Sequence, residues 1–205
     1  MNIKTAVPIA LTGLTLCLAA CSAEAPKESS STGSSTPVQQ SPAATSGWAF
    51  MPANGAAGIK AAGLDVLSAE GSAEHIHAHL DVISDGHAIP VPADIGFSFG
   101  SNGQPNGISA LHTHDPSGII HIEAPTAGVT YTLGQVLTEW GVLDGKDSTP
   151  GSAHSSTGDW QVYVNGTQQP GDPKDTPLRS HDEILLVHGP APATIPSSYS
   201  FPSGY

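Results

Sequence analysis

Apolar and polar residues alternate along residues 74–82, which is the pattern of a β-strand with one face in the core. The apolar face is predicted to hold Ile76, Ala78, Leu80 and Val82. The opposite face is predicted to hold His75, His77, His79 and Asp81. One face therefore resembles core, and the other presents a row of imidazoles, the commonest metal-binding side chain in proteins.

A turn is predicted directly after this strand, at Asp85-Gly86, because that dipeptide is a strong signal for a two-residue hairpin loop. Pairing around the turn sets Val82 opposite Ile89, so the apolar residues of the returning strand face the same side. His87 then falls on the core side of the hairpin next to the turn. We therefore expect His87 to lie outside the row of imidazoles.

A second histidine block surrounds the turn at residues 115–118 and has two possible registers. In the first register, His112 pairs with His121, and one face holds His112, His114, His121 and Glu123. In the second, a three-residue loop with a bulge at Gly118 shifts the strands by one residue and moves His121 off that face. The Asp-Pro-x-Gly turn favours the second register. The apolar pattern favours the first, because a slip would mix His and Ile on both faces, and we expect the first.

One helix is predicted at about residues 132–140. Thr132 and Gln135 have the spacing of a capping box at its start, and Gly141 is a stop signal at its end. Apolar side chains recur at i, i+3, i+4 and i+7, namely Leu133, Val136, Leu137 and Trp140. This spacing gives one apolar stripe, which we interpret as a core-facing surface.

Further elements are weaker or shorter. Residues 160–166 are predicted as a strand that runs into a turn, and residues 183–188 as another apolar strand. A second helix with imperfect periodicity is predicted at about residues 56–68. The expected fold class is α+β, mainly β with one principal helix.

The beginning of the chain has the features of an export signal. Residues 1–20 contain Lys4 followed by an apolar stretch, and Leu18-Ala19-Ala20-Cys21 resembles the lipobox of bacterial lipoproteins. The resemblance implies cleavage before Cys21 and attachment of lipid to its sulfur. Residues 21–46 are mostly Ser, Thr, Pro, Ala, Gln and Gly, a composition expected of a disordered tether. Residues 47–205 remain as one globular, histidine-rich domain.

The charge balance argues against a nucleic-acid partner. The chain has 6 Lys and Arg against 18 Asp and Glu, a formal net charge of −12, whereas nucleic-acid binding needs a basic patch. An acidic, histidine-rich surface suits cations instead. The expected partners are therefore a metal ion and, through the lipid anchor, the outer side of the cell membrane. No feature of the sequence identifies a protein partner.

The histidine blocks predict one transition-metal site. Its main expected ligands are His77, His79, His112, His114 and His121. Further candidates, as ligands or as groups that orient the rings, are Asp115, Glu123 and His75. The two cysteines of the chain are Cys17 and Cys21, and Met51 is the one methionine after the signal, so a soft Cu(I) site is disfavoured. Nitrogen and oxygen ligands favour zinc or copper(II). The single histidines His154, His181 and His188 are expected at the surface or in caps.

Two resemblances accompany these predictions. Residues 131–189 run as strand, helix, strand ending Val164-Asn165-Gly166, and last strand, and they resemble the back half of a β-grasp (ubiquitin-like) domain. Sulfur carriers of that fold end in Gly-Gly, whereas this sequence ends Ser203-Gly204-Tyr205, so the resemblance implies a fold and not a carrier function.

The whole of residues 47–205 is also similar to a family of secreted or lipid-anchored histidine-rich proteins common in actinobacteria, to which no activity is attached. The shared segments lie at residues 74–80, 91–96, 111–123, 132–135, 163–166 and 195–202.

Two alternatives to a metal-binding or metal-delivery lipoprotein stay open. A metal-dependent extracytoplasmic enzyme could be a hydrolase, with Glu123 or Asp115 as base, or a cupin-like oxygenase. The cupin resemblance rests on the spacing of His75, His77 and Asp81 between glycines, where Asp stands in place of the usual Glu. The second alternative is an interaction module without a metal.

Overall fold

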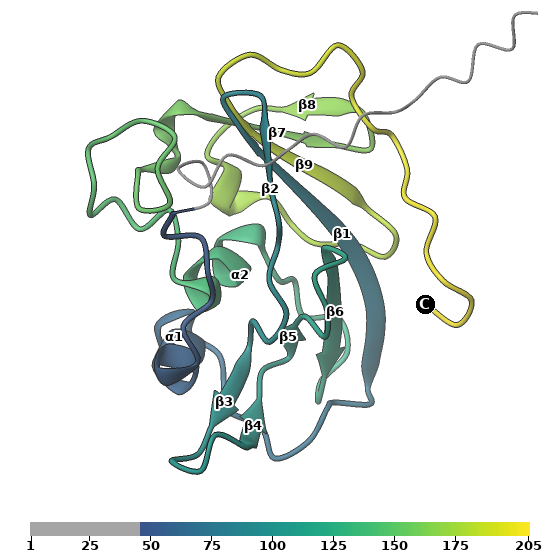
Figure 1. Ribbon diagram of the computed structural model, residues 1–205. Coiled ribbons are helices and arrows are strands. Elements are labelled where there is room, and N and C mark those ends of the chain that lie inside the picture. Colours follow the sequence, from purple (N-terminus) through teal and green to yellow (C-terminus); the bar gives the residue numbers. More distant parts are fainter. Residues whose placement is uncertain (1–45) are drawn as a thin grey trace, which may run out of the picture. The chain divides into compact units, whose positions relative to one another are not determined.

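The computed structural model describes residues 46–205 (Figure 1), so the predicted signal peptide, the predicted lipidation site Cys21 and the predicted tether up to residue 45 lie outside the described residues. The helices are α1 (Gly55–Ala61) and α2 (Leu133–Trp140), with single 3-10 turns at Pro52–Asn54, Thr157–Asp159 and Pro173–Asp175. The strands are β1 (Glu74–Ser84), β2 (His87–Ile89), β3 (Phe97–Phe99), β4 (Pro105–Ile108), β5 (Leu111–His112), β6 (Ile119–Ala124), β7 (Trp160–Val164), β8 (Thr167–Gln169) and β9 (Glu183–His188). This is the expected α+β class, mainly β with α2 as its principal helix.

The main sheet has the strand order β5-β6-β1-β9-β7-β8, and β2 pairs with β1. The central strands β1 and β9 are parallel, whereas β6 and β7 are antiparallel to their neighbours β1 and β9. The parallel central pair is thus flanked by antiparallel strands, and α2 lies between β6 and β7 in sequence. The β-grasp resemblance of residues 131–189 stays a prediction.

The core lies between one face of this sheet and α2. The predicted apolar face of β1 is confirmed, since Ala78, Leu80 and Val82 are each no more than 1% exposed. All four predicted apolar residues of α2 are buried against them. The helix begins with the predicted capping box of Thr132 and Gln135 and ends at Gly141, whose φ of 82° is the left-handed conformation that glycine adopts without strain. One face of β1 is thereby fixed in the core, and its histidines are on the other.

Both predicted hairpin registers are confirmed. Val82 pairs with Ile89 across the Asp85-Gly86 turn. In the second hairpin, His112 pairs with His121, as the first of the two registers requires. The apolar pattern thus outweighed the turn chemistry, because Ile120 and Ile122 are at most 1% exposed and a slip would have brought His121 into their place in the core.

The second predicted helix is wrong in its later half. α1 ends at Ala61, and Gly63 follows with a φ of 75°, which stops the helix. Leu67 then pairs as an isolated bridge with Ile108 in β4. The short hairpin of β3 and β4, which the pattern did not predict, provides this pairing partner, and tertiary pairing therefore overrides the weak helical periodicity.

The segment after β9 runs along the sheet face that carries the histidines (Figure 1, yellow). Three of its aromatic rings contact histidines: Tyr199 stacks on His79, Phe201 on His181, and Tyr205 lies against His77. The ring centroids of Tyr199 and His79 are 3.7 Å apart, with the planes inclined by 8°. The outer face of β1 is therefore partly covered by the chain itself.

Candidate metal centre

Three histidines lie side by side across three neighbouring strands. β6 is placed between β5 and β1, and its His121 pairs with His112 on one side and with His77 on the other. Directly paired residues in a sheet point to the same face, so the three rings gather on the face opposite the core. All three side chains are buried, with 1 to 6% of each residue exposed. Two sequence blocks about forty residues apart thus form one cluster.

The first potential ligand group joins β1 and β6. It comprises His75, His77, His121 and Glu123, and one ligand atom from each lies within 4.8 Å of all the others. His121 Nδ1 is 3.2 Å from His77 Nε2 and 3.1 Å from Glu123 Oε1. His75 Nε2 is 3.2 Å from the same carboxylate oxygen.

These separations match the spacing of ligands around a small ion. Two ligands bound at about 2.0 Å to a tetrahedral zinc ion are roughly 3.3 Å apart. Hydrogen bonds alone cannot account for these contacts. His121 Nδ1 has one in-plane site, either an N–H or a lone pair, but both His77 Nε2 and Glu123 Oε1 lie within 3.2 Å of it. A cation between the three atoms would contact all of them.

A second group lies on the other side of His121. It comprises His112, His114 and His121, again with ligand atoms within 4.8 Å of one another, and Glu70 reaches it from the loop before β1. Glu70 Oε1 is 3.6 Å from His114 Nε2 and 4.0 Å from His112 Nε2. The spacing is looser than in the first group, and both His114 and Glu70 have side chains that are at least 40% exposed.

The ring of His112 is oriented for ligation. Its Nδ1 lies 3.1 Å from the carbonyl oxygen of Ser109, and since a carbonyl only accepts, Nδ1 carries the proton. Nε2 then presents a lone pair, and it has no hydrogen-bond partner among residues 46–205 although it is buried. A backbone carbonyl that holds one ring nitrogen and leaves the other for an ion is a usual arrangement at metal-binding histidines.

The electrostatics keep these rings neutral. Burial, followed by the charges of neighbouring imidazoles, lowers the pKa of His77 to about 4 and that of His121 also to about 4. The same causes lower the pKa of His112 to about 3. Neutral imidazole is the form that binds metal ions, so the cluster is in its ligand form near neutral pH.

His79 belongs to a different environment although it was predicted in the same row. Its Nδ1 is 2.7 Å from Glu183 Oε2 and its Nε2 is 2.9 Å from the carbonyl oxygen of Ser117. Both partners accept, so both nitrogens donate and the ring carries a positive charge. Burial lowers its pKa, but the hydrogen bond and charge of Glu183 outweigh that effect and the pKa is raised. His79, Asp81 and Glu183 also have ligand atoms within 4.8 Å of one another, but with both ring nitrogens donating, His79 has no lone pair free for an ion.

Of the other predicted residues, His75, His114 and Glu123 join the groups described above, and Asp115 does not. Asp115 is exposed, and its Oδ1 accepts the backbone N–H of Ser117 at 2.8 Å, which stabilises the turn before β6. Glu70 was not predicted from the sequence. It lies in an irregular segment where no periodicity indicates which way a side chain points.

The first group is accessible from the surface. The side chain of His75 is 58% exposed, and a cavity of about 330 Å³ opens beside it, lined by residues that include His77, His181 and Tyr205. The Tyr205 ring centroid is 4.6 Å from that of His77 and 5.3 Å from that of His121. An ion can therefore reach the cluster past Tyr205.

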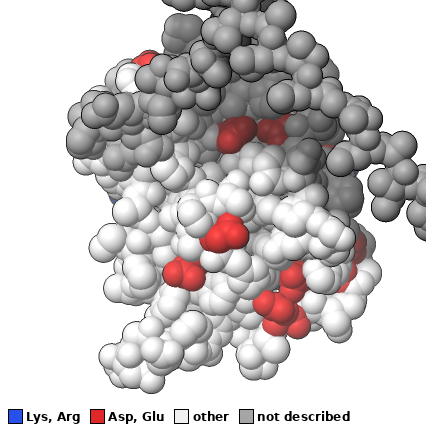
Figure 2. Space-filling model, turned by 45° about the vertical axis from the view of Figure 1, so that its right-hand side comes forward, with Lys and Arg blue, Asp and Glu red and all other residues white. Residues whose placement is uncertain are grey.

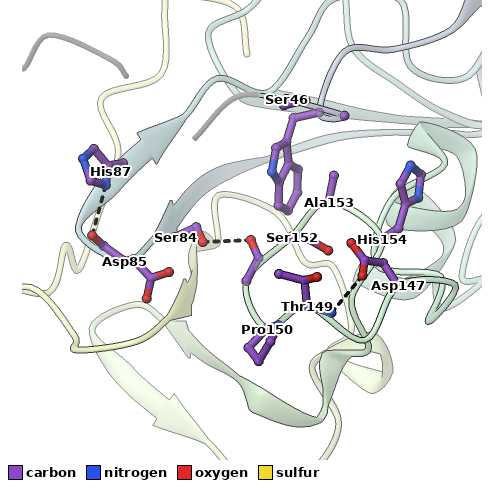
Figure 3. A pocket seen from close by; sticks show the side chains of 13 residues that line it. Ser46, Ser84, Asp85, His87, Asp147, Thr149, Pro150, Ser152, Ala153 and His154 are labelled. Carbon is purple, nitrogen blue, oxygen red and sulfur yellow. Dashed lines mark hydrogen bonds between the residues drawn. The ribbon is translucent and has the colours of Figure 1, made fainter. Parts of the chain in front are cut away.

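A separate cavity of about 590 Å³ contains histidines that the sequence placed outside the cluster (Figure 3). His87 and His154 line it together with Asp147, whose carboxylate accepts the backbone N–H of Thr149 at 2.8 Å. His87 Nδ1 donates to the backbone oxygen of Asp85 at 3.0 Å. Neither histidine belongs to a potential ligand group of the described residues, which makes His87 a suitable control position.

No protein-family model, curated protein or solved structure matches the chain. The family resemblance stated from the sequence therefore stays a prediction. Among residues 46–205, no helix is long and apolar enough to cross a membrane.

Proposed function

We propose that the protein is a cell-surface lipoprotein that binds a transition metal ion, zinc or copper(II), through the histidine cluster of β1, β5 and β6, for metal binding or delivery. The observation that carries the proposal is the set of three contacts of 3.1 to 3.2 Å among His75, His77, His121 and Glu123. Their separations fit the edges of a tetrahedral shell with bonds of about 2.0 Å.

The chemistry of the donors supports these metals. The shell offers three imidazoles and one carboxylate and no sulfur, and such sites favour zinc or copper(II) over Cu(I). Two rings of the group are neutral near pH 7 because burial and neighbouring imidazoles lower their pKa values. His121 Nδ1 cannot form good hydrogen bonds to His77 and to Glu123 at the same time. A bound ion would replace these competing contacts with metal–ligand bonds.

The charge of the surroundings also favours a cation. Within residues 46–205, the ion pairs of Lys residues are Lys60 with Asp65 and Lys146 with Asp144, and neither involves a carboxylate of the cluster. The face in Figure 2 shows Asp and Glu side chains and hardly any Lys or Arg. Within the described residues, no Lys side chain is therefore paired with Glu70 or Glu123.

Calorimetric titration tests the proposal. The full chain, purified in detergent and stripped of metal, is titrated with Zn²⁺ and with Cu²⁺, together with His121→Gln and with the control variant His87→Gln. We expect tight binding by the wild type and by His87→Gln, and affinity lower by about 100-fold or more in His121→Gln. Circular dichroism of the metal-free variants checks that both fold. Equal, weak binding by all three proteins would show that the cluster is only a polar surface.

X-ray absorption of the zinc-loaded chain separates binding from catalysis. A closed shell of protein nitrogens and oxygens favours a binding or delivery role, whereas a shell with one bound water favours the enzyme alternative. The anchor is tested separately: after Cys21→Ser, the protein should appear in the soluble fraction rather than with membranes. Membrane retention equal to that of the wild type would exclude lipid attachment at Cys21.

A further inference from the structure

One ring is shared by two of the potential ligand groups of the described residues. His121 lies in the group with His75, His77 and Glu123, and also in the group with His112 and His114. It occupies the middle strand of the three, with its partners on β5 and β1 at either side. The ring centroids of His77 and His114 are 4.6 and 4.5 Å from that of His121, and both rings stand edge-on to it.

The two ring nitrogens of His121 differ in their surroundings. Nδ1 is the atom that contacts His77 and Glu123. If Nδ1 serves the first group, Nε2 is the nitrogen that remains for the second. Imidazole can bind two ions at once, one at each nitrogen, after it loses its N–H proton.

We propose that the cluster holds two transition-metal ions bridged by the His121 ring. The first ion is bound by His75, His77 and Glu123, and the second by His112, His114 and Glu70. This inference rests on the proposed metal-binding function and deepens it, from one ion to a dinuclear centre.

The number of donors supports two ions. A zinc ion in a protein is usually bound by four ligands, whereas the two groups together with Glu70 offer seven residues. Within the described residues, the buried Nε2 of His112 has no hydrogen-bond partner, and its neighbours are the second group's members. One ion at the first group would leave that lone pair without a partner, which buried polar atoms rarely are. A second ion supplies the missing contact.

The charges also balance. Neutral His121 carries one N–H, and binding of the second ion releases that proton to solvent, which leaves a singly negative ring. With one negative charge each from Glu70 and Glu123, the centre holds three negative charges against four positive charges from two divalent ions. Ligand atoms of Glu123, Glu70 and His112 also lie within 4.8 Å of one another, so the Glu123 carboxylate is close to residues of both groups.

Stoichiometry provides the first test. The full, metal-stripped chain is loaded with Cu²⁺, dialysed, and analysed for bound copper per chain. We expect two ions in the wild type and in the control His87→Ala. We expect one ion in the first-group variant His75→Ala/His77→Ala, and one in the second-group variant Glu70→Ala/His114→Ala, each folded in the metal-free state by circular dichroism.

Electron paramagnetic resonance tests the bridge. A ring shared by two Cu²⁺ ions couples their spins, so the two-copper wild type should give a signal weaker than two isolated ions, while each one-copper variant gives the full signal of one. Two ions with additive signals would overturn the bridge. A wild type that binds one ion would also overturn it but leave the proposed function intact, whereas a wild type that binds none would remove both.

Discussion

His77 and His79 lie two residues apart on the same face of the same strand, yet their chemistry is opposite. Each is at most 4% exposed. Beside His77 lies another imidazole, His121 of β6, and burial together with the charge of that imidazole lowers the pKa of His77 to about 4. Beside His79 lies a carboxylate, Glu183 of β9, and the pKa of His79 is raised.

The difference shows that the strand next to a histidine decides its role. β1 is paired with β6 at one edge and with β9 at the other, and the two histidines face different neighbours as β1 passes between them. A ring among imidazoles stays neutral and can bind an ion. A ring between a carboxylate and a carbonyl becomes a charged structural group, with both nitrogens engaged.

The largest expected effect is acid destabilisation by the neutral cluster. The pKa values of His77 and His121 are about 4 and that of His112 about 3, against an ordinary 6.5. Between pH 6.5 and the lowered pKa values, the unfolded chain binds protons that the folded chain does not. The neutral rings therefore cost no stability above pH 6.5, and the free energy of unfolding decreases as the pH falls towards 4. We expect the metal-free chain to lose on the order of 5 kcal/mol across this window, about half the sum of the three shifts, because the neighbouring rings titrate together and solvent screens them in part.

Urea unfolding at a series of pH values measures that loss. The double variant His77→Asn/His121→Asn should show a clearly shallower decline, because two of the three titrating groups are gone. If the wild type and the double variant decline in parallel, the cluster does not control acid stability, and the contrast between His77 and His79 disappears.

The second prediction concerns the charged pair. Glu183→Gln removes the carboxylate that holds the His79 charge, and loss of one partner of a buried pair costs about 3–4 kcal/mol. The raised pKa of His79 means that its contribution is fully present below pH 6.5 and is lost as the pH rises through the folded-state value. The destabilisation should therefore be larger at pH 6 than at pH 9, as measured by urea unfolding. An equal loss at both pH values would indicate a packing effect instead.

The third prediction compares the two histidines directly. His77→Gln should weaken Zn²⁺ binding by about 100-fold, which is roughly 2.7 kcal/mol at 1.36 kcal/mol per tenfold change. His79→Gln should change the affinity by less than about threefold, because its nitrogens are already engaged by Glu183 and Ser117. Calorimetry on both variants decides the matter. Similar losses in the two would mean that His79 leaves Glu183 to join the shell.

Much of the cluster followed from local pattern. Alternation predicted which residues of β1, β5 and β6 share a face, and the apolar residues of β6 selected the register that pairs His112 with His121. The division between His77 and His79 could not be predicted, because it depends on the pairing of β1 with β9, about one hundred residues later in the chain. Alternation reports the face of a residue and not the strand beside it.

Glu70 shows a second limit of sequence patterns. It approaches His112 and His114 from a loop, where side-chain direction has no period to predict it. The helix predicted at 56–68 failed for a related reason, since Leu67 pairs with the distant Ile108. In both cases a contact between remote segments determined the local structure.

The last prediction extends the comparison to buried carboxylates. Glu183 has His79 as its partner, whereas Glu139 of α2, which is 2% exposed, has no hydrogen-bond partner for either carboxylate oxygen among residues 46–205. Burial raises the pKa of Glu139 to about 8, and the nearby Ser109 acts weakly in the opposite direction. Near neutral pH, Glu139 is therefore held in its protonated form.

The sign of the resulting pH effect is opposite to that of the histidine cluster. Between the ordinary pKa of 4.5 and about 8, the folded chain holds a proton that the unfolded chain releases, so this group lowers stability as the pH rises. Glu139→Gln removes the ionisation while keeping the shape of the side chain. We expect it to raise the free energy of unfolding by about 2 kcal/mol at pH 8 and to leave it nearly unchanged at pH 5. The exposed Asp159→Asn serves as control and should change neither value. A gain at pH 5 as large as that at pH 8 would show that Glu139 destabilises the fold through packing. Its protonation would then not be the reason why the fold accepts a buried carboxyl group without a partner.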